Sequence, residues 1–212
     1  MVTDDTTRHA PAIFRPLVAF DFDGTLTWRD SFVAFLRWRV GEARYAWGTL
    51  RLAPAVFAYF LHRDRARLKS AMVRLFLGGH TRAELSRAAD QFAAEQARHL
   101  LRPDAIRCWK RWQSQGARLV IVTASPEILV APFARGLGAD RVIGTRLALD
   151  KADRLTGDLE GLNCRGFEKV VRLKAAFGDD LRVEAAYGDS DGDIEMLAIA
   201  EEPGMKVFGE RP

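Results

Sequence analysis

The fold of this chain is decided by one stretch, Leu17-Val-Ala-Phe-Asp21-Phe-Asp23-Gly24-Thr25-Leu-Thr27. Its four leading apolar residues predict a buried strand, and in strict strand geometry the two aspartates that follow would share one face. Gly24 and Thr25 predict an immediate turn. At the carboxyl end of a strand in an α/β sheet, such a pair faces the crevice where ligands bind. The alternative for this stretch alone is a polar strand end with an ordinary Asp-Gly turn.

Composition predicts a globular protein with one sizeable core, because 48% of the 212 residues are hydrophobic and 28% are charged. The two cysteines, Cys108 and Cys164, lack zinc-site spacing and suit a reducing compartment. Residues 1–12 contain no long apolar run, so we expect a loose tail and no signal peptide. We therefore expect a cytoplasmic protein.

Basic residues concentrate in one segment, which predicts a basic surface that faces a partner. Residues 31–103 hold 13 Lys and Arg against 5 Asp and Glu, whereas the rest of the chain holds 19 against 23. No RNA- or DNA-binding signature accompanies this charge, so nucleic acid is not the expected partner.

The same segment has a helical pattern and contains no predicted strand. Asp30 is placed to cap its first helix, and Thr81 opens a capping box for its last. The expected helical stretches are 31–40, 45–61, 64–76 and 81–101. They predict an inserted helical cap over residues 30–103.

Strands and helices alternate from residue 103 onward. The expected strands are 118–123, 141–145, 183–189 and 205–208, with a hairpin over 147–159 that turns at 156–158. The expected helices are 104–115, one opening at Pro126, 167–177 and 193–200. This alternation predicts an α/β fold with a mostly parallel sheet covered on both faces.

Polar residues follow three of the expected strands: Asp21 and Asp23, Thr123 and Ser125, Asp189 and Asp193. Parallel strands would bring these ends to one edge of the sheet. Crowded carboxylates raise one another's pKa, and a bound divalent cation relieves that repulsion. Oxygen ligands favour Mg²⁺ over zinc. A calcium loop is the alternative for residues 188–193, although the distal Glu of an EF-hand is missing.

Four segments resemble, in order, the motifs of the haloacid dehalogenase (HAD) superfamily of phosphohydrolases: residues 21–27, 122–125, Lys169 and 188–193. The resemblance covers nearly the whole chain, because the helical segment between the first two motifs is where the phosphoserine-phosphatase-like branch carries its cap. It implies a Rossmann-like core over residues 13–29 and 104–212, a cap over 30–103, and Mg²⁺-dependent hydrolysis of phosphomonoesters.

The resemblance also implies a role for each matching residue. Asp21 would be the nucleophile that forms an aspartyl-phosphate, and Asp23 would be the general acid and then the base. Thr123 and Lys169 would hold the phosphoryl group and neutralise its charge. The expected metal ligands are Asp21, Asp23 through its carbonyl, Asp189 and Asp193. The expected substrate-binding residues are Gly24, Thr25, Asp30, Ala124, Ser125 and Ser190.

Two finer resemblances bear on the substrate. Phosphoserine phosphatases carry an acid at about the position of Asp30 and an arginine in the cap, where Arg74 lies in the right region but not clearly in register. The segments 35–38, 65–67, 79–81 and 164–169 give a closer resemblance, to the phosphatidylglycerophosphatase C group, whose members act on a lipid phosphate. We therefore favour an amphiphilic or lipid phosphate such as phosphatidylglycerophosphate. Phosphoserine or another small phosphorylated metabolite is the alternative, and a non-catalytic phospho-ligand-binding module is a third.

An apolar run over residues 52–61 fits the lipid hypothesis. It is followed by Arg63, Arg65, Arg67 and Lys69, and it is too short to span a bilayer. Such a stretch is suited to peripheral contact with an anionic membrane at its inner face. The alternative is that the run forms the inside of the cap bundle, with its arginines in water. The sequence leaves the oligomeric state open.

Overall fold

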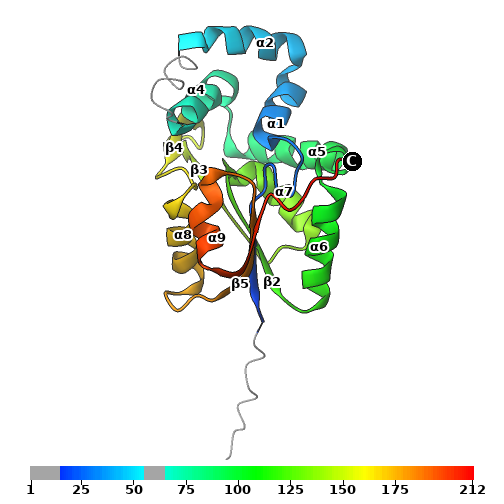
Figure 1. Cartoon of the computed structure of the whole chain (residues 1–212). Coiled ribbons are helices and arrows are strands. Elements are labelled where there is room, and N and C mark those ends of the chain that lie inside the picture. Colours follow the sequence, from blue (N-terminus) through cyan, green and yellow to red (C-terminus); the bar gives the residue numbers. More distant parts are fainter. Residues whose placement is uncertain (1–14, 55–64) are drawn as a thin grey trace, which may run out of the picture.

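The computed structural model describes residues 15–54 and 65–212, and a six-stranded sheet forms its centre (Figure 1). The strand order is β4-β3-β2-β1-β5-β6, and every neighbouring pair is parallel except β3 with β4. The strands are β1 (Leu17–Phe20), β2 (Arg118–Pro126), β3 (Arg141–Leu149), β4 (Leu155–Glu160), β5 (Val183–Gly188) and β6 (Ala200–Met205). The predicted α/β fold with a mostly parallel sheet is confirmed.

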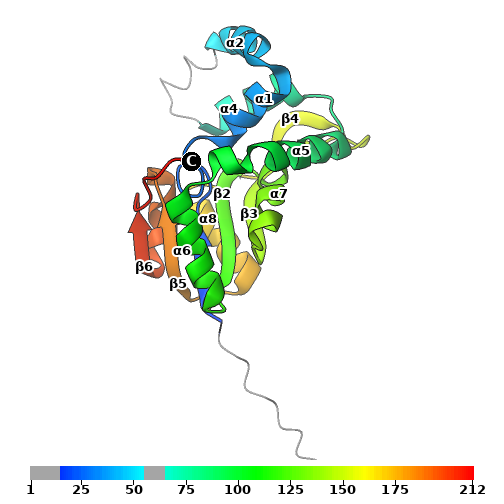
Figure 2. The same ribbon diagram turned by 90° about the vertical axis from the view of Figure 1, so that its right-hand side faces the viewer.

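Strand β1 is apolar throughout because both of its faces are covered. Val18 and Phe20 belong to one buried cluster, shared with α6 and α7, whereas Leu17 and Ala19 belong to another, shared with α8 and α9. The sheet is thus sandwiched between two helical layers (Figure 2). The helices are α1 (Ser31–Val40), α2 (Glu42–Arg51), α4 (Arg65–Leu77), α5 (Arg82–Leu100), α6 (Pro103–Ser114), α7 (Glu127–Leu137), α8 (Phe167–Phe177), the short 3₁₀ helix η1 (Asp191–Asp193) and α9 (Ile194–Ala198).

Local signals set the ends of the first helices. The Asp30 carboxylate accepts a hydrogen bond from the Val33 amide at 2.8 Å, and Gly41 ends α1 with a φ of 80°. At α5, Thr81 Oγ1 accepts from the Glu84 amide and the Glu84 carboxylate accepts from the Thr81 amide, which is the predicted capping box. Helices α1, α2, α4 and α5 lie beyond the carboxyl end of the central strands (Figure 1).

The predicted hairpin is present, but it turns earlier than expected. Its turn is at residues 150–154, where the Asp150 carboxylate accepts from the amides of Ala152 and Arg154 at 2.8 and 2.9 Å. The expected turn residues 156–158 lie within β4 instead. There Gly157 packs so closely on α4 that a Cβ would come within 2.5 Å of the Arg74 side chain. Glycine is needed at this position for that contact and for its φ of 94°, and not for the hairpin turn.

Three other local predictions were wrong. The last strand covers residues 200–205 rather than 205–208, because that segment pairs with β5 over its full length. Pro126 is the residue before α7 rather than its first helical residue. The helix expected over 45–61 runs from Glu42 to Arg51, and residues 55–61 lie outside the described part of the chain. Among the described residues, no helix has the length and apolar character needed to cross a membrane.

Candidate active site

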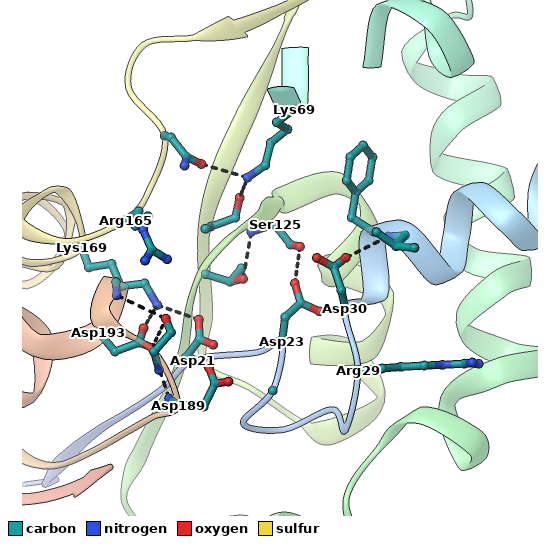
Figure 3. A pocket seen from close by; sticks show the side chains of 18 of the residues that line it. Asp21, Asp23, Arg29, Asp30, Lys69, Ser125, Arg165, Lys169, Asp189 and Asp193 are labelled. Atoms are coloured by element: carbon teal, nitrogen blue, oxygen red, sulfur yellow. Dashed lines mark hydrogen bonds and ion pairs between the residues drawn. The ribbon is translucent and has the colours of Figure 1, made fainter. Parts of the chain in front are cut away.

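A cavity of about 630 Å³ opens at the carboxyl ends of the neighbouring strands β1, β2 and β5, and residues of α1 and α4 complete its lining; Figure 3 shows its side chains. Eleven of the twelve residues expected at the site line it: Asp21, Asp23, Gly24, Asp30, Thr123, Ala124, Ser125, Lys169, Asp189, Ser190 and Asp193. The twelfth, Thr25, is buried beside them and does not line the cavity. The tertiary structure therefore brings together segments that are up to 172 residues apart in the chain.

Lys169 is the centre of a buried charge cluster. Its Nζ donates to Asp21 Oδ1 at 2.6 Å, to Asp193 Oδ1 at 2.5 Å and to the Val122 carbonyl at 2.7 Å, and the residue is 1% exposed. Burial raises the pKa of Asp21 to about 7 despite the lysine. Burial opposes ionisation of Asp193 as well, but the ion pair with Lys169 outweighs it and lowers the pKa of Asp193.

Three carboxylates of this cluster form a candidate metal centre. One oxygen each from Asp21, Asp189 and Asp193 lie within 4.8 Å of one another. Burial raises the pKa of Asp189, and the charge of Asp193 raises it further. An all-oxygen donor set of partly buried acids fits a hard divalent cation such as Mg²⁺, which would relieve this repulsion.

Gly24 lets the Asp189 carboxylate approach the first motif. Its φ is 84°, a conformation that favours glycine, and a Cβ at this position would overlap the Asp189 carboxylate. The Gly24 carbonyl accepts a hydrogen bond from Arg102 Nε at 3.2 Å, and another nitrogen of the same guanidinium donates to the Glu210 carbonyl at 3.0 Å. Arg102, which lies between α5 and α6, therefore links the turn after β1 to the C-terminal segment through hydrogen bonds.

The two aspartates of the first motif point in different directions (Figure 3). Because β1 ends at Phe20, strand geometry does not extend to them and the following turn places them. Asp21 faces Lys169, whereas the Asp23 carboxylate accepts from the Ser31 amide at 2.7 Å and from the Ser125 hydroxyl. Both still line one cavity, so two carboxylates with different partners are available to one substrate.

The second and fourth motifs are held by hydrogen bonds within their own loops. In the second motif, residues 122–125, Thr123 Oγ1 accepts a hydrogen bond from the Ser125 amide at 3.0 Å, and the Ser125 hydroxyl donates to the Asp23 carboxylate of the first motif. In the fourth motif Ser190 Oγ donates to Asp193 Oδ2 at 2.9 Å and accepts from the Gly192 amide at 3.2 Å. These bonds fix the hydroxyl groups around the cavity.

Lys69 is a site residue that the sequence did not reveal. One of the two hypotheses for its segment placed it at lipid headgroups, but α4 carries it into the cavity, where Nζ donates to Asn163 Oδ1 at 2.9 Å and to the Ala124 carbonyl. Burial lowers the pKa of Lys69 to about 8. Asn163 and Arg165 also line the cavity and were not predicted as site residues. Lys69 resembles its neighbours in a basic run, so no local signal distinguished it.

Asp30 serves the site as well as the helix it caps. The residue is exposed overall, but its carboxylate lines the cavity, where desolvation and the nearby charge of Asp23 raise its pKa to about 6. Arg74, by contrast, is exposed and forms an ion pair with Asp158 at 2.5 Å, and it does not line the cavity. The apolar part of the lining comes from Trp28, Phe32, Val33, Leu68 and Met72.

The family model for haloacid dehalogenase-like hydrolases matches residues 18–198 of this chain. The chain belongs to this family. It is 57% identical over 196 residues to the protein CicA of Caulobacter vibrioides, a match that covers 92% of this chain and 88% of CicA. It is 26% identical over 196 residues to a probable phosphatase of Mycobacterium tuberculosis, covering 86% of this chain and 66% of that protein.

Solved structures agree on the fold. A protein of unknown function from Bordetella pertussis aligns with a TM-score of 0.73 at 25% identity, covering 89% of this chain and 88% of that one. A phosphoserine phosphatase with a phospho-aspartyl intermediate analogue aligns with a TM-score of 0.59 at 22% identity, covering 89% and 85%. The predicted HAD-like phosphatase with a phosphoserine-phosphatase-like fold is thereby confirmed, while the resemblance to the phosphatidylglycerophosphatase C group stays a prediction.

Proposed function

We propose that this HAD-like phosphatase is a Mg²⁺-dependent phosphomonoester hydrolase that works through an aspartyl-phosphate on Asp21. The observation that carries the proposal is the cluster of Asp21, Asp189 and Asp193 around the Lys169 ammonium, at one end of the cavity. Asp21 and Asp189, with the Asp23 carbonyl, would hold Mg²⁺, and Asp193 would support the site. The bound ion would neutralise charge on the phosphoryl group.

In the first step a carboxylate oxygen of Asp21 attacks phosphorus, and the bond from phosphorus to the leaving oxygen breaks. Asp23 donates its proton to that oxygen, so the product leaves as an alcohol. The hydrogen bonds from Ser31 and Ser125 hold the Asp23 carboxyl at the cavity wall for this transfer. Thr123, Lys169 and the amides of Ala124 and Ser125 would stabilise the phosphoryl oxygens.

In the second step Asp23 accepts a proton from water, and the water oxygen attacks phosphorus. The bond from phosphorus to Asp21 breaks, which releases inorganic phosphate and restores both carboxyl groups. Asp23 thus acts first as acid and then as base. It is free for this role because its carboxyl bonds to Ser31 and Ser125, whereas the Asp21 carboxylate is paired with the Lys169 ammonium. A non-catalytic binding module on this fold would have no use for such a second carboxyl.

For the substrate we propose a phosphomonoester whose leaving group has polar and apolar parts. Lys69 and Asp30 line the same cavity as the residues proposed to hold the phosphate, and so do the apolar residues Phe32, Leu68 and Met72. This lining supports the favoured amphiphilic phosphate, for example phosphatidylglycerophosphate. Phosphoserine remains the alternative, with Asp30 for its amine and Lys69 for its carboxylate, because Arg74 is already engaged with Asp158.

Acid-quench trapping tests the proposed nucleophile. After mixing with a ³²P-labelled phosphomonoester and Mg²⁺, the wild-type chain should carry alkali-labile ³²P. The Asp21→Asn variant should carry none, and its kcat should fall by roughly a thousandfold or more. Asp180→Asn, a change at an exposed acid in the turn before β5, is the matched control and should behave as wild type. Labelling of the Asp21→Asn variant would refute the assignment.

A side-by-side assay tests the substrate class. Release of inorganic phosphate is measured from phosphatidylglycerophosphate in mixed micelles and from phosphoserine in solution. We expect the larger kcat/KM for the lipid phosphate. Turnover of phosphoserine alone would leave the aspartyl-phosphate mechanism intact and overturn the lipid proposal.

A further inference from the structure

Helix α2 presents an apolar face to solvent at the end of the molecule farthest from the sheet (Figures 1 and 2). Trp47 is 69% exposed and Leu50 is 67% exposed, and Ala43 and Ala46 are exposed beside them. These four residues recur at the spacing of one helical face and define the outer face of α2. Single exposed apolar residues are ordinary, but a tryptophan and a leucine grouped on one face mark an interaction surface.

The opposite side of α2 is attached to the rest of the protein. Tyr45 stacks on Phe76 of α4 with ring centroids 5.5 Å apart, and Gly48 is buried against the same ring. A Cβ at Gly48 would overlap Phe76, so the close approach requires glycine. The helix therefore has an inner side that is packed and an outer face that is left to solvent.

The charges next to the outer face are basic. Arg44 and Arg51 are exposed on α2, and the described part of the chain shows no ion pair for either. The acid of this helix, Glu42, is already engaged by Arg37 of α1 at 2.7 Å. A partner that fits this face would therefore be apolar where it meets the centre of the face and anionic where it meets the edge.

We propose that the outer face of α2 docks on an anionic phospholipid bilayer. An apolar stripe with tryptophan and leucine, flanked by arginines, is the composition of helices that lie in the membrane interface. At ten residues the helix is only about 15 Å long, which is small for a stable protein–protein interface but sufficient for reversible insertion of two side chains. The inference goes beyond the proposed function, because it does not require the substrate to be a lipid.

Vesicle cosedimentation tests the docking, with phosphatidylcholine vesicles that contain or lack phosphatidylglycerol. The full chain should bind the anionic vesicles, less strongly as salt is raised, and Trp47→Ser should lower the partition coefficient by about tenfold. Leu162→Ser is the matched control, because Leu162 is also 69% exposed but lies between β4 and α8. It should leave binding unchanged. Activity on a soluble phosphomonoester should be that of wild type in both variants, which reports correct folding.

Two results would overturn the inference. The first is an absence of binding to anionic vesicles, or a loss in Leu162→Ser equal to that in Trp47→Ser. The second is a dimer in sedimentation equilibrium that Trp47→Ser dissociates, because the outer face would then serve a second copy of the chain. A drop in binding for Arg44→Glu, confined to vesicles with phosphatidylglycerol, would support the electrostatic part.

Discussion

Replacing Lys169 by methionine should lower the free energy of unfolding far more than a surface substitution, because the Lys169 ammonium is the counter-ion of two buried acids. Methionine has similar length and no charge, so it removes the ammonium without leaving a large cavity. The Asp21 and Asp193 carboxylates then lose their cation, and the Val122 carbonyl loses its donor. Breaking a buried ion pair from one side costs about 3–5 kcal/mol, so the free energy of unfolding should fall by about that amount.

The pH dependence separates charge from packing. In the wild type the pKa of Asp21 is raised from 3.8 to about 7, so the folded state holds this proton more tightly and stability falls as pH rises through that window. Without Lys169 both carboxylates should keep their protons to higher pH. The loss caused by Lys169→Met should therefore be largest above pH 7 and shrink as the pH falls, because the two carboxyl groups of the folded variant are then protonated and leave no unpaired charge in the core.

Urea unfolding followed by circular dichroism, at several pH values with EDTA present, measures this effect. Lys174→Met is the matched control, because Lys174 is an exposed lysine on the same helix, α8. It should change the unfolding free energy by less than about 0.5 kcal/mol. A Lys169→Met loss below about 1 kcal/mol, or one independent of pH, would refute the description of Lys169 as the counter-ion of two buried acids.

Two further changes test the cavity. Gly24→Ala should cost about 1–3 kcal/mol of stability and most of the activity, because the φ of Gly24 is 84° and the new methyl group would displace Asp189. Urea unfolding measures the stability, and Mg²⁺ titration of activity measures the effect on the metal site. A Mg²⁺ dependence close to that of wild type would contradict the reasoning. The pKa of Lys69 is lowered to about 8, so KM should rise as pH increases through 8 while the ammonium is lost. Lys69→Met should show a higher KM without that rise, and a persisting rise would assign it to another group.

Much of the fold was readable from the sequence because local chemistry dictates it. A strand that is apolar at every position must be covered on both faces, which predicted the parallel sheet around β1. Asp30 and Thr81 begin helices through bonds to amides three residues away, so their effect needs no other part of the chain. The order of the four motifs likewise lies in the sequence, and the family model for haloacid dehalogenase-like hydrolases matches residues 18–198, a span that contains all four.

The positions of individual side chains required the tertiary structure. Asp23 turns to a serine 102 residues away, and Lys69 enters the cavity to contact Asn163, 94 residues away. The hairpin turn was misplaced because Gly157 serves a contact with α4, and close packing between elements leaves no trace in a local pattern. Sequence therefore determined the order of the strands and helices and the first residues of α1 and α5. Contacts between distant segments decided where charged side chains point, because burial and partners set the free energy of each orientation.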